Sequence, residues 1–138
     1  MNRNKRLPGC VIYEDGGYDL ALAKQSVGVG WHGILERLFN AKPDWLMVVQ
    51  VKEKFGGLRF YTDDGTVRVD CIGLGTFAVP AEEGQFTEDQ VMQSAAFRKL
   101  VQEAEAESFS VCEDCGAPGR RRSGAWIRTL CNQCHKNR

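Results

Sequence analysis

The amino-acid sequence predicts an α+β fold, in which a small antiparallel sheet packs on two helices and a C-terminal zinc ribbon follows. Three features predict this class. Apolar residues recur at helical spacing in residues 31–39 and again after Thr87. Runs at 45–52 and 58–62 are β-branched or alternating, which is typical of strands. Two Cys-x2-Cys pairs near the C-terminus indicate a metal site.

Length and composition are those of an ordinary globular protein. The chain has 138 residues, of which 43% are hydrophobic and 26% charged, so it suffices for one modest core or a small domain with an appendage. No window approaches the run of about 18 apolar residues that spans a membrane. No apolar signal-peptide core follows the basic N-terminal residues. We therefore expect a cytoplasmic protein that makes no membrane contact.

The first forty residues are predicted to hold a basic arm, a short strand and one helix. Residues 1–9 are expected to form a flexible basic arm, and residues 10–13 a strand. In residues 31–39, apolar side chains fall at i, i+3, i+4, i+7 and i+8, which places them in one helical stripe. Gly30 precedes this helix, and Pro43 follows it.

Three strands are predicted next. Residues 45–52 are apolar and β-branched, and residues 58–62 and 67–71 alternate between apolar and polar. Phe55-Gly56-Gly57 predicts a turn between the first two strands. Asp63-Asp64-Gly65 is a strong hairpin signal before the third strand. Together these segments predict one short antiparallel sheet.

A loop and a long helix complete the predicted α+β domain. Residues 73–86 hold three glycines and a proline, which favour a loop. Thr87-Glu88-Asp89-Gln90 has the form of a capping box, so we expect a helix from there to about Ser108. Its predicted buried stripe is Phe97, Leu100, Val101 and Ala104. The glutamates expected in solvent are Glu103, Glu105 and Glu107.

Four of the six cysteines have the spacing of a zinc site. Fifteen residues separate the pair Cys112 and Cys115 from the pair Cys131 and Cys134. Two residues between paired cysteines let a tight turn aim both sulfurs at one point, and two such turns at hairpin tips complete a tetrahedron. Gly116 follows the first pair and tolerates a positive φ. Because four thiolates leave no open coordination position, we predict one structural Zn2+.

Other uses of the cysteines remain open at this point. Residues 131–135 match the attachment motif of c-type haem, which leaves the first pair unexplained. A redox dithiol would need a thioredoxin-like pattern around it, and an iron–sulfur cluster would use four cysteines. Cys10 and Cys71 stand apart in apolar surroundings and are expected to be small buried hydrophobes, with a link between them left open.

A basic and aromatic cluster lies between the two cysteine pairs. It consists of Arg120, Arg121, Arg122, Trp126 and Arg128. Arginines interleaved with an aromatic side chain can hold a phosphate backbone and stack on a base. The alternative is that Trp126 and Ile127 pack the ribbon against the long helix while the arginines face solvent. Acids dominate residues 81–110 in contrast, so the basic end could also balance charge within the molecule.

No segment carries the pattern of a catalytic or nucleotide site. Lys52–Arg59 is rich in glycine and base but lacks the spacing of a phosphate-binding loop, and Gly28-x-Gly30 lacks the third glycine of a dinucleotide site. His32 and Glu36 share a helix face and are expected to form a surface ion pair. We therefore predict that the protein is not an enzyme.

Three motifs resemble a group of small uncharacterised proteins of bacteriophages and prophages. They are Gly30-Trp31-x-x-Ile34-Leu35-x-Arg37-Leu38, the block Val49–Tyr61 (VQVKEKFGGLRFY), and Ala104-Glu105-x-Glu107-Ser108 followed by Cys112-Glu-x-Cys115-Gly-Ala-Pro-Gly. The match covers most of residues 30–134. In such proteins the second strand runs almost directly into the long helix, so residues 63–86 are expected to be an insertion.

The resemblance implies a phage accessory protein and no particular reaction. We expect a protein with an α+β domain at 10–110 and a zinc ribbon at 111–138, which binds, and modulates or inhibits, a host or phage protein in the host cytoplasm. The alternative is a nucleic-acid-binding protein that uses the basic and aromatic surface of the ribbon. The oligomeric state is left open.

Overall fold

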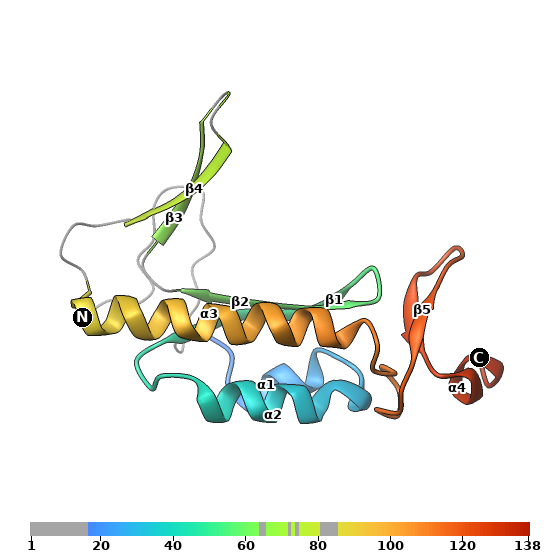
Figure 1. Ribbon diagram of the computed structural model, residues 1–138. Coiled ribbons are helices and arrows are strands. Elements are labelled where there is room, and N and C mark those ends of the chain that lie inside the picture. The colour runs from blue at the N-terminus through green and yellow to red at the C-terminus, as the bar shows by residue number, and fades with distance from the viewer. Residues whose placement is uncertain (1–16, 64–65, 72, 74, 81–85) are drawn as a thin grey trace.

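The computed structural model describes residues 17–63, 66–71, 73, 75–80 and 86–138 (Figure 1). The predicted basic arm at 1–9, the strand at 10–13 and Cys10 lie outside these residues. In chain order, the elements are α1 (Leu20–Gln25), the 3-10 helix η2 (Val29–Trp31), α2 (His32–Ala41), β1 (Met47–Lys54), β2 (Gly57–Asp63), β3 (Thr66–Cys71), β4 (Gly75–Pro80), α3 (Glu88–Ser108), β5 (Arg120–Arg122), β6 (Arg128–Leu130) and α4 (Asn132–Lys136). The predicted α+β class is confirmed.

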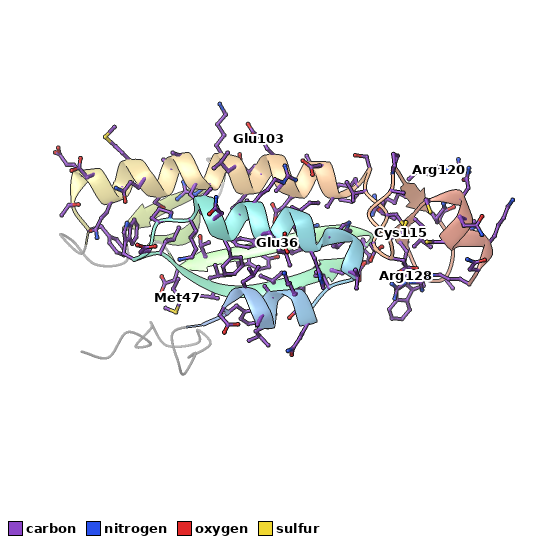
Figure 2. All side chains as sticks on the ribbon, turned by 90° about the horizontal axis from the view of Figure 1, so that it is seen from below. Glu36, Met47, Glu103, Cys115, Arg120 and Arg128 are labelled. Atoms are coloured by element: carbon purple, nitrogen blue, oxygen red, sulfur yellow. The ribbon has the colours of Figure 1, made fainter. Side chains whose placement is uncertain are left out.

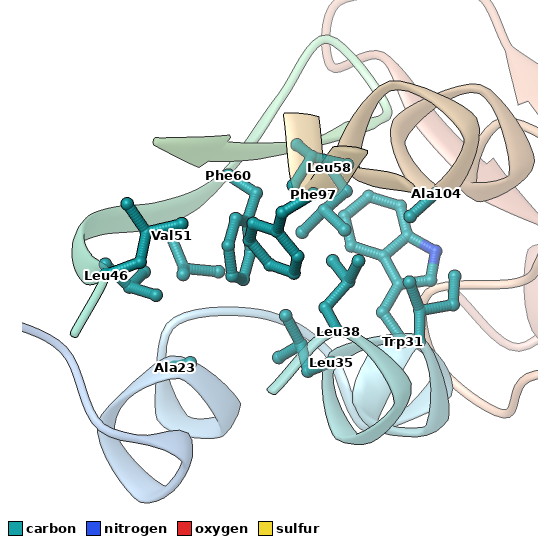
Figure 3. Packing of buried hydrophobic residues seen from close by; sticks show 13 residues of the cluster. Ala23, Trp31, Leu35, Leu38, Leu46, Val51, Leu58, Phe60, Phe97 and Ala104 are labelled. Carbon is teal, nitrogen blue, oxygen red and sulfur yellow. The ribbon is translucent and has the colours of Figure 1, made fainter. Parts of the chain in front are cut away.

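The sheet of β1 and β2 packs against the helices α2 and α3. Helix α3 lies lengthwise over β2 and also contacts α2, while α1 contacts α2 and β1 (Figure 1). The hydrophobic core fills the space between these elements and includes Trp31 of η2, Leu58 of β2 and Phe97 of α3 (Figure 3). Burial of such side chains is the main stabilising contribution in a domain of this size.

The predicted helical stripe of residues 31–39 is confirmed. Ile34, Leu35 and Leu38 are buried along α2, and Phe39 packs edge-to-face on Phe60, with ring centroids 5.7 Å apart. Trp31 is buried as predicted but belongs to η2, which leads into α2. The stripe therefore joins the helix to the sheet, as its spacing indicates.

The two strands of the main sheet meet in a two-residue turn. Strand β1 pairs antiparallel with β2, with Lys54 opposite Gly57. The turn residues Phe55 and Gly56 both have positive φ, of 53° and 81°. Two positive φ values are required by the type I′ turn, whose twist suits a hairpin. A glycine adopts this conformation freely, whereas a phenylalanine is an outlier there.

The outer edge of β2 is covered by side chains of α3. The Leu58 amide donates to Ser108 Oγ at 2.9 Å, and the Phe60 amide donates to Glu105 Oε2 at 2.9 Å. Edge-strand amides left unpaired are a template for association with other strands. The expectation that Glu105 lies in solvent is therefore wrong, because its carboxylate is half-buried and completes the hydrogen bonding of a strand.

Strand β3 forms as predicted, but it does not extend the sheet of β1 and β2. It pairs antiparallel with β4, and this hairpin stands away from the main sheet (Figure 1). The prediction of a loop throughout 73–86 is wrong, since residues 75–80 form β4. The edge of β2 that β3 would need is already bonded to Ser108 and Glu105. The hairpin falls within 63–86, and the status of that segment as an insertion stays a prediction.

The capping box of the long helix is confirmed in both directions. Gln90 N donates to Thr87 Oγ1, and Thr87 N donates to Gln90 Oε1. Phe97, Val101 and Ala104 are buried as predicted, whereas Leu100 is 42% exposed and does not belong to the buried face.

Helix α1 was not predicted, although Asp19 supplies an N-cap by accepting from Leu22 N at 2.8 Å. Its six residues are too few to show a periodic stripe. Glu36 pairs with Lys24 of α1 at 2.7 Å rather than with His32. Instead, His32 Nε2 lies 2.8 Å from the Lys24 carbonyl oxygen. The expected acid–histidine pair is thus replaced by a link between α1 and α2.

The first prediction concerns the half-buried Glu105. Burial raises the pKa of this carboxyl above its ordinary value of 4.5, in spite of the hydrogen bond from Phe60 and the nearby Arg59. The folded state therefore holds the proton more tightly than the unfolded state, so stability falls as pH rises from 4.5 through the raised value. We expect Glu105→Gln to remove this fall and to be more stable than the wild type at neutral pH. Urea unfolding between about pH 4 and about pH 8 measures it.

The exposed Glu103, on the same helix, provides the matched control. Glu103→Gln should leave the pH profile of the unfolding free energy unchanged. Lower stability of Glu105→Gln at neutral pH would contradict the prediction, because it would show that the Phe60 amide needs a charged acceptor.

Candidate metal centre and adjoining basic surface

The four predicted cysteine ligands converge at the C-terminal end of the molecule. The sulfur atoms of Cys112, Cys115, Cys131 and Cys134 all lie within 4.8 Å of one another, and those of Cys115 and Cys131 are 3.7 Å apart. A tetrahedron with metal–sulfur bonds of about 2.3 Å has edges of about 3.8 Å. The donor set and its dimensions therefore fit a single metal ion, and the C-terminal hairpin with its four cysteines resembles a zinc ribbon.

The first pair lies in a tight backbone turn. Gly116 N donates to the Cys112 carbonyl at 2.9 Å, and Cys112 N donates to the Ala117 carbonyl at 2.8 Å. Gly116 has a φ of 82°, so its predicted left-handed conformation is confirmed. Val111 and Pro118 bridge the base of the turn. These bonds hold the Cys112 and Cys115 side chains on the same side of the loop.

The second pair lies at the start of a helix, where a hairpin tip was expected. Cys131 is the N-cap of α4, and its sulfur accepts from Cys134 N at 3.4 Å. The strands β5 and β6 form a hairpin that delivers the chain from the first pair to this helix. The cysteines are three residues apart in both pairs, across one tight turn in the first and one helical turn in the second, and all four sulfurs reach a common centre.

The surroundings of the four sulfurs favour ionisation of Cys112 and oppose ionisation of Cys134. Burial opposes ionisation of Cys112, but the backbone amides of Cys131, Cys115 and Asp114 bond to its sulfur and lower its pKa to about 7. The neighbouring sulfurs of Cys131 and Cys115 raise the pKa of Cys134 to about 12. Thiolates crowded together repel one another, and a divalent cation at their centre removes this penalty. The electrostatics therefore match a cation site.

The turn of the first pair is packed directly against the α+β domain. Gly30 N donates to the Glu113 carbonyl at 2.8 Å, and the Trp31 indole donates to the Val111 carbonyl at 2.9 Å. A Cβ atom at Gly30 would overlap the carbonyl oxygen of Cys112 and lie 2.6 Å from Gly116 N. Backbone meets backbone here, and only glycine leaves the necessary room.

The tip of the main hairpin forms a second contact with residues 111–138, which we call the cysteine module. Thr129 Oγ1 donates to the Gly56 carbonyl at 2.6 Å, and Arg121 Nε donates to the Phe55 carbonyl at 2.9 Å. The ring of Phe109 fills the space beside Gly57, where any Cβ would overlap it. Gly56 therefore serves this contact, and Gly57 leaves room for Phe109 at the end of α3, in addition to the turn itself.

These two contacts form the joint between the α+β domain and the cysteine module. Glu113 lies at its centre and was not singled out by sequence reasoning. Its side chain is 2% exposed, accepts from Thr129 N at 2.7 Å, and lies 3.8 Å from Arg128 Nη1. Burial raises the pKa of this carboxyl, against the opposing effect of the Thr129 bond. Its backbone also bonds to Thr129 and Gly30. A residue between paired cysteines thus links the metal turn, strand β6 and the core.

The predicted basic and aromatic residues divide over two sides of the module. Trp126 is 69% exposed, so it does not pack the ribbon against the long helix. With Arg122, Ser123, Arg128, Leu130, His135 and Arg138, it lines an open hollow of about 380 Å³. The Arg128 guanidinium lies over the Trp126 ring, 5.6 Å from its centroid. The structure therefore brings three arginines and one exposed indole together.

Arg120 and Arg121 do not line this hollow. Arg121 lies over the Phe109 ring, 5.3 Å from its centroid, and helps to hold the joint. Arg120 is exposed, and Figure 2 shows it on the opposite side of the module from Arg128. Arg138, which sequence reasoning passed over, lines the hollow and forms a two-pronged ion pair with Asp114 through Nε and Nη2.

Comparisons with other proteins leave the family open. No protein-family model, curated protein or solved structure matches the chain. The resemblance to small phage and prophage proteins stays an expectation. Within the part of the chain that the structure describes, every helix is too short or too polar to cross a membrane.

The second prediction tests the close backbone contact at Gly30. Gly30→Ala should lower the free energy of unfolding by about 3 kcal/mol, because the added methyl overlaps the Cys112 carbonyl and the turn must shift. Thermal and urea unfolding measure the effect.

Gly33, in the first turn of α2, provides a matched control. Nothing lies within 4 Å of a Cβ at this helical position. Gly33→Ala should therefore leave the stability unchanged or raise it by about 0.5 kcal/mol. Equal stability of the two alanine variants would show that the turn does not approach Gly30 as closely as described.

Proposed function

We propose that the four cysteines hold one Zn2+ ion in a closed, structural site. The support is the donor set, since four sulfurs at tetrahedral spacing suit zinc and leave no position for a substrate. An iron–sulfur cluster would use the same ligand number, and metal content separates the two. The ion would neutralise the mutual repulsion of the thiolates and fix the start of α4 against the first turn.

The third prediction concerns metal content and its effect on folding. Purified protein should contain one zinc and no iron by elemental analysis. Cys131→Ser should lose the metal and unfold residues 111–138, and it should also weaken the core where Gly30 and Trp31 bond to the module. Near-ultraviolet circular dichroism reports both changes. Iron in the protein, or an unchanged spectrum in metal-free Cys131→Ser, would contradict the proposal.

We infer that this metal-held module binds nucleic acid through its basic and aromatic hollow. The single observation that carries this function is the exposed Trp126 among Arg122, Arg128 and Arg138. Arginine holds phosphate by paired hydrogen bonds, and an exposed aromatic ring offers a stacking surface for a base. The geometry thus favours nucleic acid, which sequence reasoning had placed second.

The net charge of the hollow stays positive when the carboxylates paired with its arginines are counted. Asp114 neutralises Arg138 in part, and the buried Glu113 lies 3.8 Å from Arg128. Among the described residues, the bonds of Arg122 go to neutral groups, the Leu130 carbonyl and the Asn132 amide oxygen. Few phosphates can be held by so small a surface, so binding should be modest and sensitive to salt.

The fourth prediction tests this binding with a labelled oligothymidylate of about 15 nucleotides, followed by fluorescence anisotropy. The affinity should fall about tenfold between about 50 mM and about 200 mM salt. Arg138→Ala should weaken binding and flatten the salt dependence, because it removes one phosphate-binding charge from the hollow.

Arg120→Ala removes the same charge outside the hollow and provides the control. It should weaken binding less than Arg138→Ala does. Absence of binding at the lower salt concentration, with the metal site filled, would rule out this function.

A protein partner is the second candidate, and a different observation favours it. Phe55 is 56% exposed at the hairpin tip with φ of 53°, a costly conformation for a bulky residue. Exposed aromatic side chains are frequent anchors of protein interfaces. With the resemblance to phage accessory proteins, this supports binding of a host or phage protein in the host cytoplasm by a protein without catalytic activity.

The fifth prediction examines the Phe55 conformation. Phe55→Asn gives the Asn-Gly pair that type I′ turns prefer, so the free energy of unfolding should rise by about 1 kcal/mol. Urea unfolding measures this change in free energy. Tyr61→Asn, at an exposed position of β2, is the control and should not stabilise the protein. A destabilised Phe55→Asn would show that the ring serves the fold, which removes the reason for a docking role.

A further inference from the structure

Trp126 is placed differently from the other two tryptophans. Trp31 is fully buried and donates to the Val111 carbonyl. Trp45 is half-buried, lies against Phe86 with ring centroids 5.1 Å apart, and donates to Gln93 Oε1. Trp126 is mostly open to solvent, with the Arg128 guanidinium over its ring. A large aromatic ring in water contributes little to folding, so the Trp126 ring is available to contact a ligand.

The cations around this ring are held in place before any ligand arrives. Arg122 donates from Nε and Nη2 to the Leu130 carbonyl at 3.2 and 3.0 Å, and from Nη2 to Asn132 Oδ1 at 2.8 Å. Arg138 is fixed by its pair with Asp114, in which Nε donates to Oδ2 at 3.1 Å and Nη2 donates to Oδ1 at 2.7 Å. Groups that are already ordered lose less conformational entropy on binding.

The dimensions of the hollow suit a single nucleotide. Its volume is about 380 Å³, at the lower end of the range of small-molecule sites. Arg122, Arg128 and Arg138 supply cations, and Trp126 supplies the aromatic surface. A base can stack on a protein ring only when it is not stacked within a duplex.

We propose that the hollow takes one unpaired nucleotide of a single-stranded nucleic acid, with its base stacked on Trp126 and its phosphate held by Arg122 and Arg138. This inference rests on the proposed nucleic-acid binding. It specifies the form of nucleic acid, a single strand, and the contact that recognises it, stacking on Trp126. Duplex would engage the arginines alone and bind more weakly. Sequence preference is small, because every base has a face that can stack.

The test compares three probes of equal length on the full-length, metal-bound protein: oligothymidylate, the same backbone without bases, and a duplex. Wild type should bind oligothymidylate at least about fivefold more tightly than the other two, as expected for stacking of one base. Trp126→Ala should lower oligothymidylate affinity to that of the abasic probe. Trp126→Phe should keep most of the preference.

Trp126 fluorescence gives a direct signal of stacking. In a Trp45→Phe protein, emission should be quenched by oligothymidylate and not by the abasic probe. Equal binding of the three probes, unaffected by Trp126→Ala, would overturn the inference while leaving the proposed nucleic-acid binding in place. Failure to bind any probe would overturn both. Because the Trp126 side chain is 69% exposed, its removal should not disturb the fold, which metal content and circular dichroism check.

Discussion

The arrangement of the molecule depends on the close approach of the first cysteine turn to Gly30. At this point the backbone of Gly30 bonds to Glu113 and leaves no space for a side chain. The neighbouring Trp31 fills the core and bonds to Val111 at the same junction. One short segment therefore joins the hydrophobic core to the metal centre. The cysteine module is packed into the domain rather than tethered to it.

This joint gives the metal centre a wider role than holding a few residues together. A short module of about thirty residues buries too little apolar area to fold by itself. Here it gains hydrogen bonds to the Phe55–Gly56 turn and to Gly30, while the domain gains partners for its own backbone groups. We therefore expect the folding of the two parts to be coupled, and an ion bound by the thiolates would also stabilise the joint.

Local patterns in the sequence predicted the parts of the fold that depend on neighbouring residues. The cysteine spacing, the Thr87–Gln90 capping box and the stripe of α2 are set by contacts within a few residues. Contacts between distant segments were missed. The glycine at position 30 marked a helix start, but its main constraint comes from residues more than 80 positions away. Strand β3 was assigned to the wrong sheet because α3 side chains had already taken the β2 edge.

The candidate binding surface was predictable only in part. The arginines and Trp126 were visible in the sequence, yet strand pairing decides which of them share a hollow. Arg122 lies opposite Arg128 across β5 and β6, while Arg121 turns to Phe55 and Phe109. Arg138 joins them through Asp114, which no spacing rule indicates. The exposure of Trp126 likewise follows from the packing of the whole module and not from its immediate sequence.

Hydrogen exchange at the Gly30 amide tests the coupling between the metal centre and the domain most directly. This amide donates to the Glu113 carbonyl at 2.8 Å, across the contact between the domain and the first cysteine turn. In the metal-bound protein it should exchange slowly, and removal of the metal by a chelator should make it exchange far faster, while amides in the middle of α3 change less. Unchanged protection of Gly30 after the metal has been removed would contradict the account.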